Sequence, residues 1–430
     1  MKFLKKHFGN NLLLKVTSFN SIGVLVKIIT GFITQKALAI FVGPQGVGFV
    51  GNFRDFIAVI QTFSTIGLSN AIIKYVSEFK ENKNKLSQIL STSLGISLIA
   101  ASFCAVIIFF TASYWNEKFF SGIYDFTLII EVSAIAIPVY ALNTMLVSVI
   151  NGYSKYRLFV LVNICSNILV LAVTLFLLWQ FRLEGALYSI VIAPVVSFII
   201  SILFVFHKRS KAKLFSFSLF NFQTLKNFKT FVLMALLSGI AMPFVRIAIR
   251  DYIEITDGKN AVGYWEAMFR ISSFYLMFFT SLMTLYVLPK LSQINNNKDF
   301  RSEIANFYKT LLPLFAATLF IFYLLRNYVI LILQTEEFYP MEPLFAWQLL
   351  GDFFKVASMV IAYQFIAKNM FWHYVFVEIF AMTALYSLCI IFISQYGFVG
   401  ASMAYALQSF LHLLLVFIIF RKKLFSFGNT

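Results

Sequence analysis

Three basic residues lie where an apolar segment should contain none. Lys27, Lys36 and Arg54 occur within Val16–Phe63, a stretch typical of two apolar helices joined by the tight turn GPQGVG. A cation near the middle of a bilayer costs roughly 2.5–3.5 kcal/mol on insertion scales, so such a residue usually faces a bundle interior or a water-filled cavity. The chemistry that these cations favour is the binding of an anion.

Charged residues recur in pairs in the second half of the chain. The pairs are Arg246 with Arg250, Glu266 with Arg270, and Asp352 with Lys355. Residues three or four apart lie on one face of a helix. Two interpretations stay open: a cation-lined cleft that binds a diphosphate, with the acids tuning its charge, or local salt bridges that hold helices together.

These residues define two predicted sets. The predicted substrate-binding cations are Lys27, Lys36, Arg54, Arg246, Arg250, Arg270 and Lys355, and the ion-coupling candidates are Asp55, Glu266 and Asp352. Lys36 and Arg250 have a plainer alternative, in which each side chain extends outward to the membrane surface. Glu131 and Glu378 are lone acids for which a position near a wetted helix end is favoured over a proton or sodium site.

Patterns typical of enzymes are missing from the sequence. The glycine-rich turn at 43–48 lacks the GK[ST] ending of a phosphate-binding loop and follows no strand. No histidine groups with a nucleophile, and the three cysteines fall inside apolar segments, which predicts neither a disulfide framework nor a metal cluster. We therefore expect no catalytic residues, no cofactor and no bound metal.

The composition requires a membrane protein. Hydrophobic residues make up 60% of the 430 residues and charged residues 12%, and the mean hydropathy is +0.83. About 20 apolar residues span the hydrocarbon core as a helix. Such windows occur at about 16–42, 47–72, 88–113, 125–150, 158–179, 184–206, 230–250, 261–288, 309–333, 343–368, 373–394 and 398–420.

The net charge of +17 follows the membrane topology. With the N-terminus inside, 24 lysines and arginines fall on the cytoplasmic side, and only Lys118, Arg182, Arg250, Lys259 and Arg326 fall outside. The positive-inside rule then places both termini in the cytoplasm. The first apolar segment is too long for a signal peptide, so we expect it to be retained. No nucleic-acid partner is needed to explain the charge.

The two halves of the chain repeat with an offset of 215 or 216 residues. Val47-Gly48-Phe49 corresponds to Val262-Gly263-Tyr264, and Phe53-Arg54 corresponds to Phe269-Arg270. Six helices return the chain to its starting side, so the repeat is parallel and its halves enclose a cleft. We predict an all-α polytopic protein with twelve transmembrane helices in two pseudo-symmetric six-helix lobes, residues 1–206 and 230–430, joined by a cytoplasmic linker at 207–229.

Four stretches resemble a known family. FVGPQGVGFVGNFRDF (41–56), FVLMALLSGIAMPFVRIAIR (231–250), RISSFYLMFFTSLMTLYVLPKLSQI (270–294) and LFAWQLLGDFFKVASMVIAYQFIAK (344–368) are similar to the Wzx-type polysaccharide flippases of the multidrug/oligosaccharidyl-lipid/polysaccharide exporter superfamily. The resemblance is to the branch that serves O-antigen and lipid III of the enterobacterial common antigen. Members often carry an acid directly after the arginine-isoleucine-serine of helix 8, where this chain has Ser273, so no coupling role is transferred to that position.

The resemblance implies a function. Its substrate would be undecaprenyl-diphosphate bearing an oligosaccharide, moved from the cytoplasmic to the periplasmic leaflet of the bacterial inner membrane by alternating access. It implies contact with membrane lipid and cooperation with a polysaccharide polymerase and a chain-length regulator. It also implies that the helices of Lys27, Arg54, Arg250, Arg270, Asp352 and Lys355 line a cationic cavity.

Three other functions are weighed against this one. A cation-coupled drug exporter of the same superfamily should have an acidic or aromatic cavity, which the basic residues disfavour. A membrane glycan polymerase or ligase needs reactive polar residues in a large outer loop, and the predicted outer loops are short. A passive channel fits poorly with two repeated halves and paired buried charges.

Overall fold

The described part of the chain consists of helices joined by short turns. The computed structural model describes residues 12–120, 124–207, 225–294 and 296–425, and these contain no β-strand. Lipid offers the backbone no hydrogen-bond partners, so a membrane-crossing segment must satisfy its own amide and carbonyl groups, as a helix does. The predicted all-α membrane fold is confirmed.

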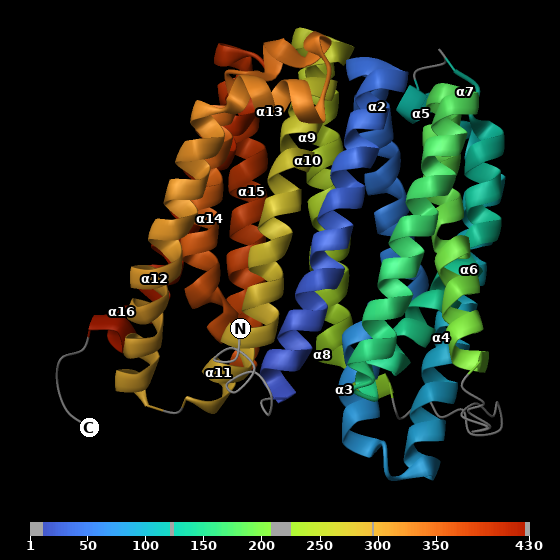
Figure 1. The fold of residues 1–430 in the computed structure, drawn as a ribbon, viewed down its shortest axis with the longest axis vertical. Coiled ribbons are helices and arrows are strands. Elements are labelled where there is room, and N and C mark those ends of the chain that lie inside the picture. The colour runs from blue at the N-terminus through green and yellow to red at the C-terminus, as the bar shows by residue number, and fades with distance from the viewer. Residues whose placement is uncertain (1–11, 121–123, 208–224, 295, 426–430) are drawn as a thin grey trace, which may run out of the picture. The chain divides into compact units, whose positions relative to one another are not determined.

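The helices of the first half are coloured from blue to green in Figure 1. They are α2 (Leu12–Thr65), α3 (Ser69–Phe79), α4 (Lys83–Phe110), α5 (Ala112–Phe120), α6 (Thr127–Gly152) and α7 (Tyr156–His207).

The helices of the second half run from yellow-green to red in Figure 1. They are α8 (Leu225–Leu236), the π-helical turn η3 (Leu237–Ala241), α9 (Met242–Asp257), α10 (Lys259–Leu282), the π-helical turn η4 (Met283–Val287), α11 (Leu288–Gln293), α12 (Asn297–Leu324), α13 (Arg326–Leu333), the 3-10 turn η5 (Glu336–Met341), α14 (Leu344–Ala367), α15 (Phe371–Tyr396) and α16 (Val399–Phe425).

Two long helices are each interrupted by one residue with positive φ. Gly43 (φ 64°) divides α2, and Pro44 begins its second segment, where the fixed φ of proline suits the first turn of a helix. Arg182 (φ 48°) divides α7. Each break falls between two windows that the sequence predicts as separate membrane helices, so α2 and α7 each contain two predicted passes.

The predicted passes are all present as helices. Nine helical segments of the described residues are long and apolar enough to cross a membrane, and two of these contain the breaks in α2 and α7. The remaining predicted pass is α10, which is richer in polar residues. Some boundaries are corrected: the predicted helix 309–333 already begins at Asn297 and ends at Leu324, and the predicted helix 230–250 continues to Asp257.

The described residues form two compact units. The first contains the described residues up to Thr30 together with Asn52–Phe244, and the second contains Gly31–Gly51 together with the described residues from Val245 onward. The second unit thus includes the turn between the first two predicted passes, which the predicted lobes assign to the first half. Most of the predicted linker 207–229 lies outside the described residues, and the lobe boundaries stay a prediction.

Small residues explain why this turn belongs to the second unit. A Cβ atom on Gly48 would lie 3.0 Å from Cγ1 of Val262, and a Cβ atom on Gly263 would lie 1.8 Å from the carbonyl oxygen of Pro44. Only glycine permits such a close approach of two backbones. Gly48 and Gly263 correspond to each other in the predicted repeat, so the equivalent motifs of the two halves pack together.

Each unit has its own apolar core. In the second unit α14 packs against α12 and α16, and Phe300, Phe365 and Phe420 are fully buried there. In the first unit α3, α4 and α6 enclose buried residues that include Leu68 and Leu90. These cores hold the helices from which the polar side chains project.

Candidate functional site

Glu266 lies between two arginines in the second unit. Its Oε2 accepts hydrogen bonds from Nη2 of Arg250 at 2.5 Å and from Nε of Arg250 at 3.2 Å, and its Oε1 accepts one from Nε of Arg270 at 2.6 Å. Arg250 and Glu266 are fully buried, whereas the Arg270 side chain is 22% exposed. Two guanidinium groups thus share the carboxylate of Glu266, and we call these three residues the arginine cluster.

The helices α9 and α10 position the arginine cluster. The spacing of Glu266 and Arg270 places both on one face of α10, and the guanidinium carbon of Arg250 lies 5.5 Å from the ring centroid of Trp265. A Cβ atom on Gly51 would lie 2.6 Å from the carboxyl carbon of Glu266, so the glycine makes room for the acid. The predicted alternative in which Arg250 extends to the membrane surface is wrong, because this side chain pairs inside the protein.

Arg270 keeps donors available for a ligand. A guanidinium has five N–H donors, and the terminal Nη groups of Arg270 have no hydrogen-bond partner among the described residues. Their planar fork suits bidentate binding to a phosphate. Glu266 therefore fixes the orientation of Arg270 and leaves its terminal nitrogens open.

Two further cations of the second unit lie on aromatic rings. The guanidinium carbon of Arg246 lies 5.2 Å from the ring centroid of Phe269, and Nζ of Lys355 lies 5.6 Å from that of Tyr405. Both cations are half-buried, and the charge of Arg246 acts on Lys355. The fold thus brings together basic residues that are far apart in the sequence.

Asp352 is held by hydroxyl groups. Its Oδ2 accepts hydrogen bonds from Ser272 at 2.6 Å and from Tyr275, and its Oδ1 accepts one from Tyr405 at 2.7 Å. Asp352 is fully buried and forms no ion pair with Lys355 in the described part of the chain. The predicted alternative of a local salt bridge is therefore absent here, whereas the Glu266–Arg270 pair does form.

A neighbouring amide extends this hydroxyl network. Gln348 donates to Oγ of Ser272 at 3.3 Å and accepts from Ser402 at 3.4 Å. A Cβ atom on Gly351 would lie 2.5 Å from Cδ1 of Tyr405, so this glycine lets the tyrosine approach α14. The helices α10, α14 and α16 thus share one buried polar network around Asp352.

Lys36 caps the C-terminal end of α13. Its ammonium group donates to the carbonyl oxygen of Leu331 at 2.7 Å and to that of Gln334. These are orphan carbonyls at the C-terminus of α13, where a cation also stabilises the helix dipole. The geometry assigns Lys36 a capping contact in the second unit.

Lys27, Arg54 and Asp55 belong to the first unit. Lys27 is exposed, and its ammonium group has no hydrogen-bond partner among the described residues. Arg54 is half-buried, Asp55 is buried, and both interact with other residues. The anion-binding role of Lys27 and Arg54 and the coupling role of Asp55 stay predictions.

The lone acids differ in their surroundings. Glu131 is half-buried within two turns of the start of α6, close to the wetted helix end that the sequence favours. Glu378 is half-buried on α15, and its charge acts on Lys355. Glu378 therefore joins the charged groups of the second unit.

Two further ion pairs lie close to helix ends. Glu303 accepts a hydrogen bond from Lys290 and thereby raises the pKa of this lysine, with Nζ and Oε2 2.5 Å apart. Glu342 likewise raises the pKa of Arg326. Both cations stay charged at physiological pH, so these pairs act as structural contacts.

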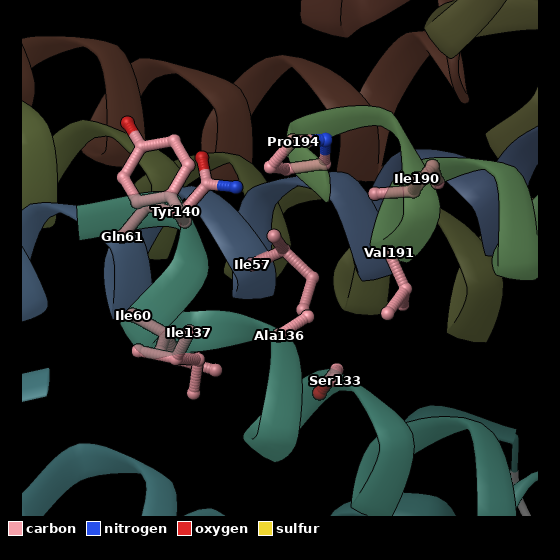
Figure 2. Close-up of a pocket in the computed structure, with 10 residues that line it drawn as sticks. All are labelled: Ile57, Ile60, Gln61, Ser133, Ala136, Ile137, Tyr140, Ile190, Val191 and Pro194. Atoms are coloured by element: carbon pink, nitrogen blue, oxygen red, sulfur yellow. The ribbon is translucent and has the colours of Figure 1, made fainter. Parts of the chain in front are cut away.

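A small pocket of about 20 Å³ lies between α2, α6 and α7 of the first unit. Figure 2 shows that aliphatic side chains line most of it, with the polar groups of Gln61 and Tyr140 side by side at one end. Its volume corresponds to about one water molecule. It cannot hold a substrate group.

The sequence analysis missed the hydroxyls around Asp352. Ser272 and Tyr275 are three apart and lie on the face of α10 that contacts Asp352. Tyr405, the third partner, belongs to α16, which is distant in the sequence. Spacing within one helix offers a weak signal for the first two residues and none for the third. The Arg250–Glu266 contact joins α9 and α10, so the spacing of residues within one helix could not predict it either.

The long apolar helices and the buried charged residues define a multi-pass membrane protein. The chain belongs to the polysaccharide biosynthesis protein family, whose profile matches residues 13–295. The predicted family resemblance is confirmed.

Known proteins match almost the whole chain. It is 28% identical over 420 residues to the lipid III flippase of Escherichia coli (strain K12), covering 96% of this chain and 99% of that protein. Its fold matches an inward-facing multidrug-resistance MATE transporter of the MOP superfamily with a TM-score of 0.79, at 13% identity and 94% and 98% coverage. It also matches the inward closed lipid II flippase MurJ with a TM-score of 0.72, at 17% identity and 95% and 87% coverage.

Proposed function

We propose that this protein is a flippase that moves an undecaprenyl-diphosphate-linked oligosaccharide from the cytoplasmic to the periplasmic leaflet of the bacterial inner membrane. The full-length similarity to a lipid III flippase supports this substrate class, and the fold supports alternating access. The observation that carries the proposal is the arginine cluster, in which the buried Glu266 orients Arg270 and leaves the terminal donors of Arg270 open. The protein is a transporter and not an enzyme.

The diphosphate is the group that the basic residues recognise. Arg270 and Lys355 supply donors, Arg246 adds positive charge, and Lys27 and Arg54 stay further predicted donors. Such a lining suits an anion and repels the organic cations that drug exporters carry. The uncharged polyprenyl chain stays in the lipid during transport.

Asp352 is the ion-coupling residue in this mechanism. It is a buried acid whose three hydroxyl partners come from α10 and α16, so a change in its charge alters contacts between these helices and α14. Glu266 acts differently, because it orients Arg270. Both termini lie in the cytoplasm, and a polysaccharide polymerase and a chain-length regulator work on the exported unit.

Deletion of the gene in its host tests this function. We expect a complete lipid-linked repeat to accumulate on the cytoplasmic leaflet, and its sugars then identify the glycan as O-antigen or the enterobacterial common antigen. Wild-type protein should restore export. A repeat that reaches the periplasmic leaflet in the deletion strain but stays unpolymerised contradicts the flippase and favours a polymerase.

A further inference from the structure

The first unit contains a polar pocket that is separate from the arginine cluster. It lies between α3, the end of α6 and both ends of α7, and it has a volume of about 350 Å³. Sites for small molecules typically have roughly 300–1,000 Å³. All of its lining residues belong to the first unit.

The lining residues recur at helical spacing. Three pairs of polar lining residues are four apart: Thr144 and Ser148 on α6, Asn163 and Asn167 near the start of α7, and Ser197 and Ser201 near its end. Residues four apart share one helix face. Otherwise apolar membrane helices thus turn their polar faces toward one space, although polar groups at membrane depth are expensive.

The polar groups of this pocket have unused hydrogen-bonding capacity. Ser166 is 7% exposed, and its buried hydroxyl has no partner among the described residues. Asn163 and Asn167 each donate to the backbone carbonyl four residues earlier, at 2.9 Å and 2.8 Å. Their side-chain oxygens have no partner in the part of the chain that the structure describes. A buried polar group without a partner is unfavourable, so the pocket is suited to a ligand that completes these bonds.

The lining chemistry selects a neutral, polar ligand. Ten of the fourteen lining residues are serine, threonine or asparagine, and no lining residue is charged. A diphosphate would lack a counter-charge here, and a lipid chain would leave the amides and hydroxyls unpaired. Amides and hydroxyls both donate and accept hydrogen bonds, as the hydroxyl and acetamido groups of sugars do. We propose that this pocket binds a neutral sugar of the transported lipid-linked oligosaccharide, an inference that rests on the proposed function.

The test compares two lipids that differ only in the sugar. Purified full-length protein in detergent is titrated with undecaprenyl diphosphate and with undecaprenyl diphosphate bearing N-acetylglucosamine, and each affinity is measured by native mass spectrometry. Wild-type protein should bind the glycosylated lipid more tightly. The Asn163→Ala/Asn167→Ala variant should lose about tenfold in affinity for the glycosylated lipid and nothing for the bare lipid, because two neutral hydrogen bonds are removed.

The control is Ser189→Ala, also on α7, whose hydroxyl bonds to the carbonyl of Ala186 in its own helix and lies outside the pocket. It should bind both lipids like the wild type. Equal affinity of the wild type for the two lipids, or a parallel loss of both affinities in the double variant, overturns the sugar site but leaves the flippase intact. If the wild type binds neither lipid, the proposed function fails and the sugar site fails with it.

Discussion

At the scale of single residues, the carboxylate of Glu266 binds two arginines of the second unit in different ways. Glu266 binds the fully buried Arg250 and the partly exposed Arg270 with its two oxygens. A buried cation must be paired, because an unpaired one is very unfavourable. The carboxylate accepts two bonds from Arg250 but only the Nε bond from Arg270, so Arg270 keeps its terminal nitrogens for a ligand.

Replacing Arg270 tests this division of roles. We expect Arg270→Ala to reduce surface glycan at least tenfold, because hydrogen bonds to charged groups contribute about 1.5–3 kcal/mol each. Arg270→Lys should restore part of the export, since lysine keeps the charge but not the fork. Surface glycan is measured at matched protein levels in the membrane. Arg326→Ala is the control, and full export by Arg270→Ala contradicts the role of the cluster.

The hydroxyl contacts of Asp352 predict a stability effect. Tyr405→Phe removes the donor 2.7 Å from Oδ1 and should lower the melting temperature of the purified protein by several degrees. Tyr386→Phe is the matched control, because Tyr386 is 40% exposed and has no hydrogen bond to a described residue. Equal melting temperatures for both variants and the wild type refute a structural role for this hydroxyl.

At the scale of elements, Lys36 links α2 to the end of α13. Lys36→Met should speed amide hydrogen exchange in α13 by roughly two- to thirtyfold, the range expected for a cation at a helix C-terminus. Export should persist, and Lys118→Met on α5 serves as the control. Loss of export with unchanged exchange in α13 would instead favour the predicted substrate contact of Lys36.

Where α2 and α10 cross, we expect that one added methyl group strongly reduces the stability of the protein. In Gly263→Ala the new Cβ would lie 1.8 Å from a backbone oxygen, so the helices must move apart, and overpacking of this kind typically costs about 1–3 kcal/mol or more. In Gly23→Ala the nearest atom, on Val160, is 3.5 Å away, and the change should be neutral or stabilising. Size-exclusion chromatography of the detergent-solubilised protein measures both. Equal yields of folded protein contradict this packing.

The sequence predicts what depends on local pattern. Apolar windows place the passes, and the glycines at 43 and 48 mark the turn, because length and backbone freedom are properties of the segment itself. Helix ends are predicted less well, since α12 starts in polar residues that hydropathy excludes. The partners of Arg250, Asp352 and Lys36 could not be predicted, because each contact joins helices that only tertiary packing brings together.

At the scale of the whole molecule, sequence and fold agree on a transporter. The twelve passes, the repeated halves and the match to MOP-superfamily structures describe one architecture, and the family relationship extends over most of the chain. In the proposed function, the basic side chains adapt that architecture to an anionic substrate. In this account the chain carries a lipid-linked glycan through its own conformational change, with no bond made or broken.

Reconstitution into liposomes tests that claim most directly. Three sets of vesicles contain undecaprenyl-diphosphate-linked oligosaccharide and either wild-type protein, the Arg270→Ala variant or no protein. Each set is then treated from outside with a membrane-impermeant enzyme that modifies the sugar. We predict that wild-type protein exposes the inner-leaflet pool, so that nearly all of the lipid is modified, whereas the variant and the protein-free vesicles retain a protected pool. A protected pool of equal size with and without wild-type protein would contradict the flippase.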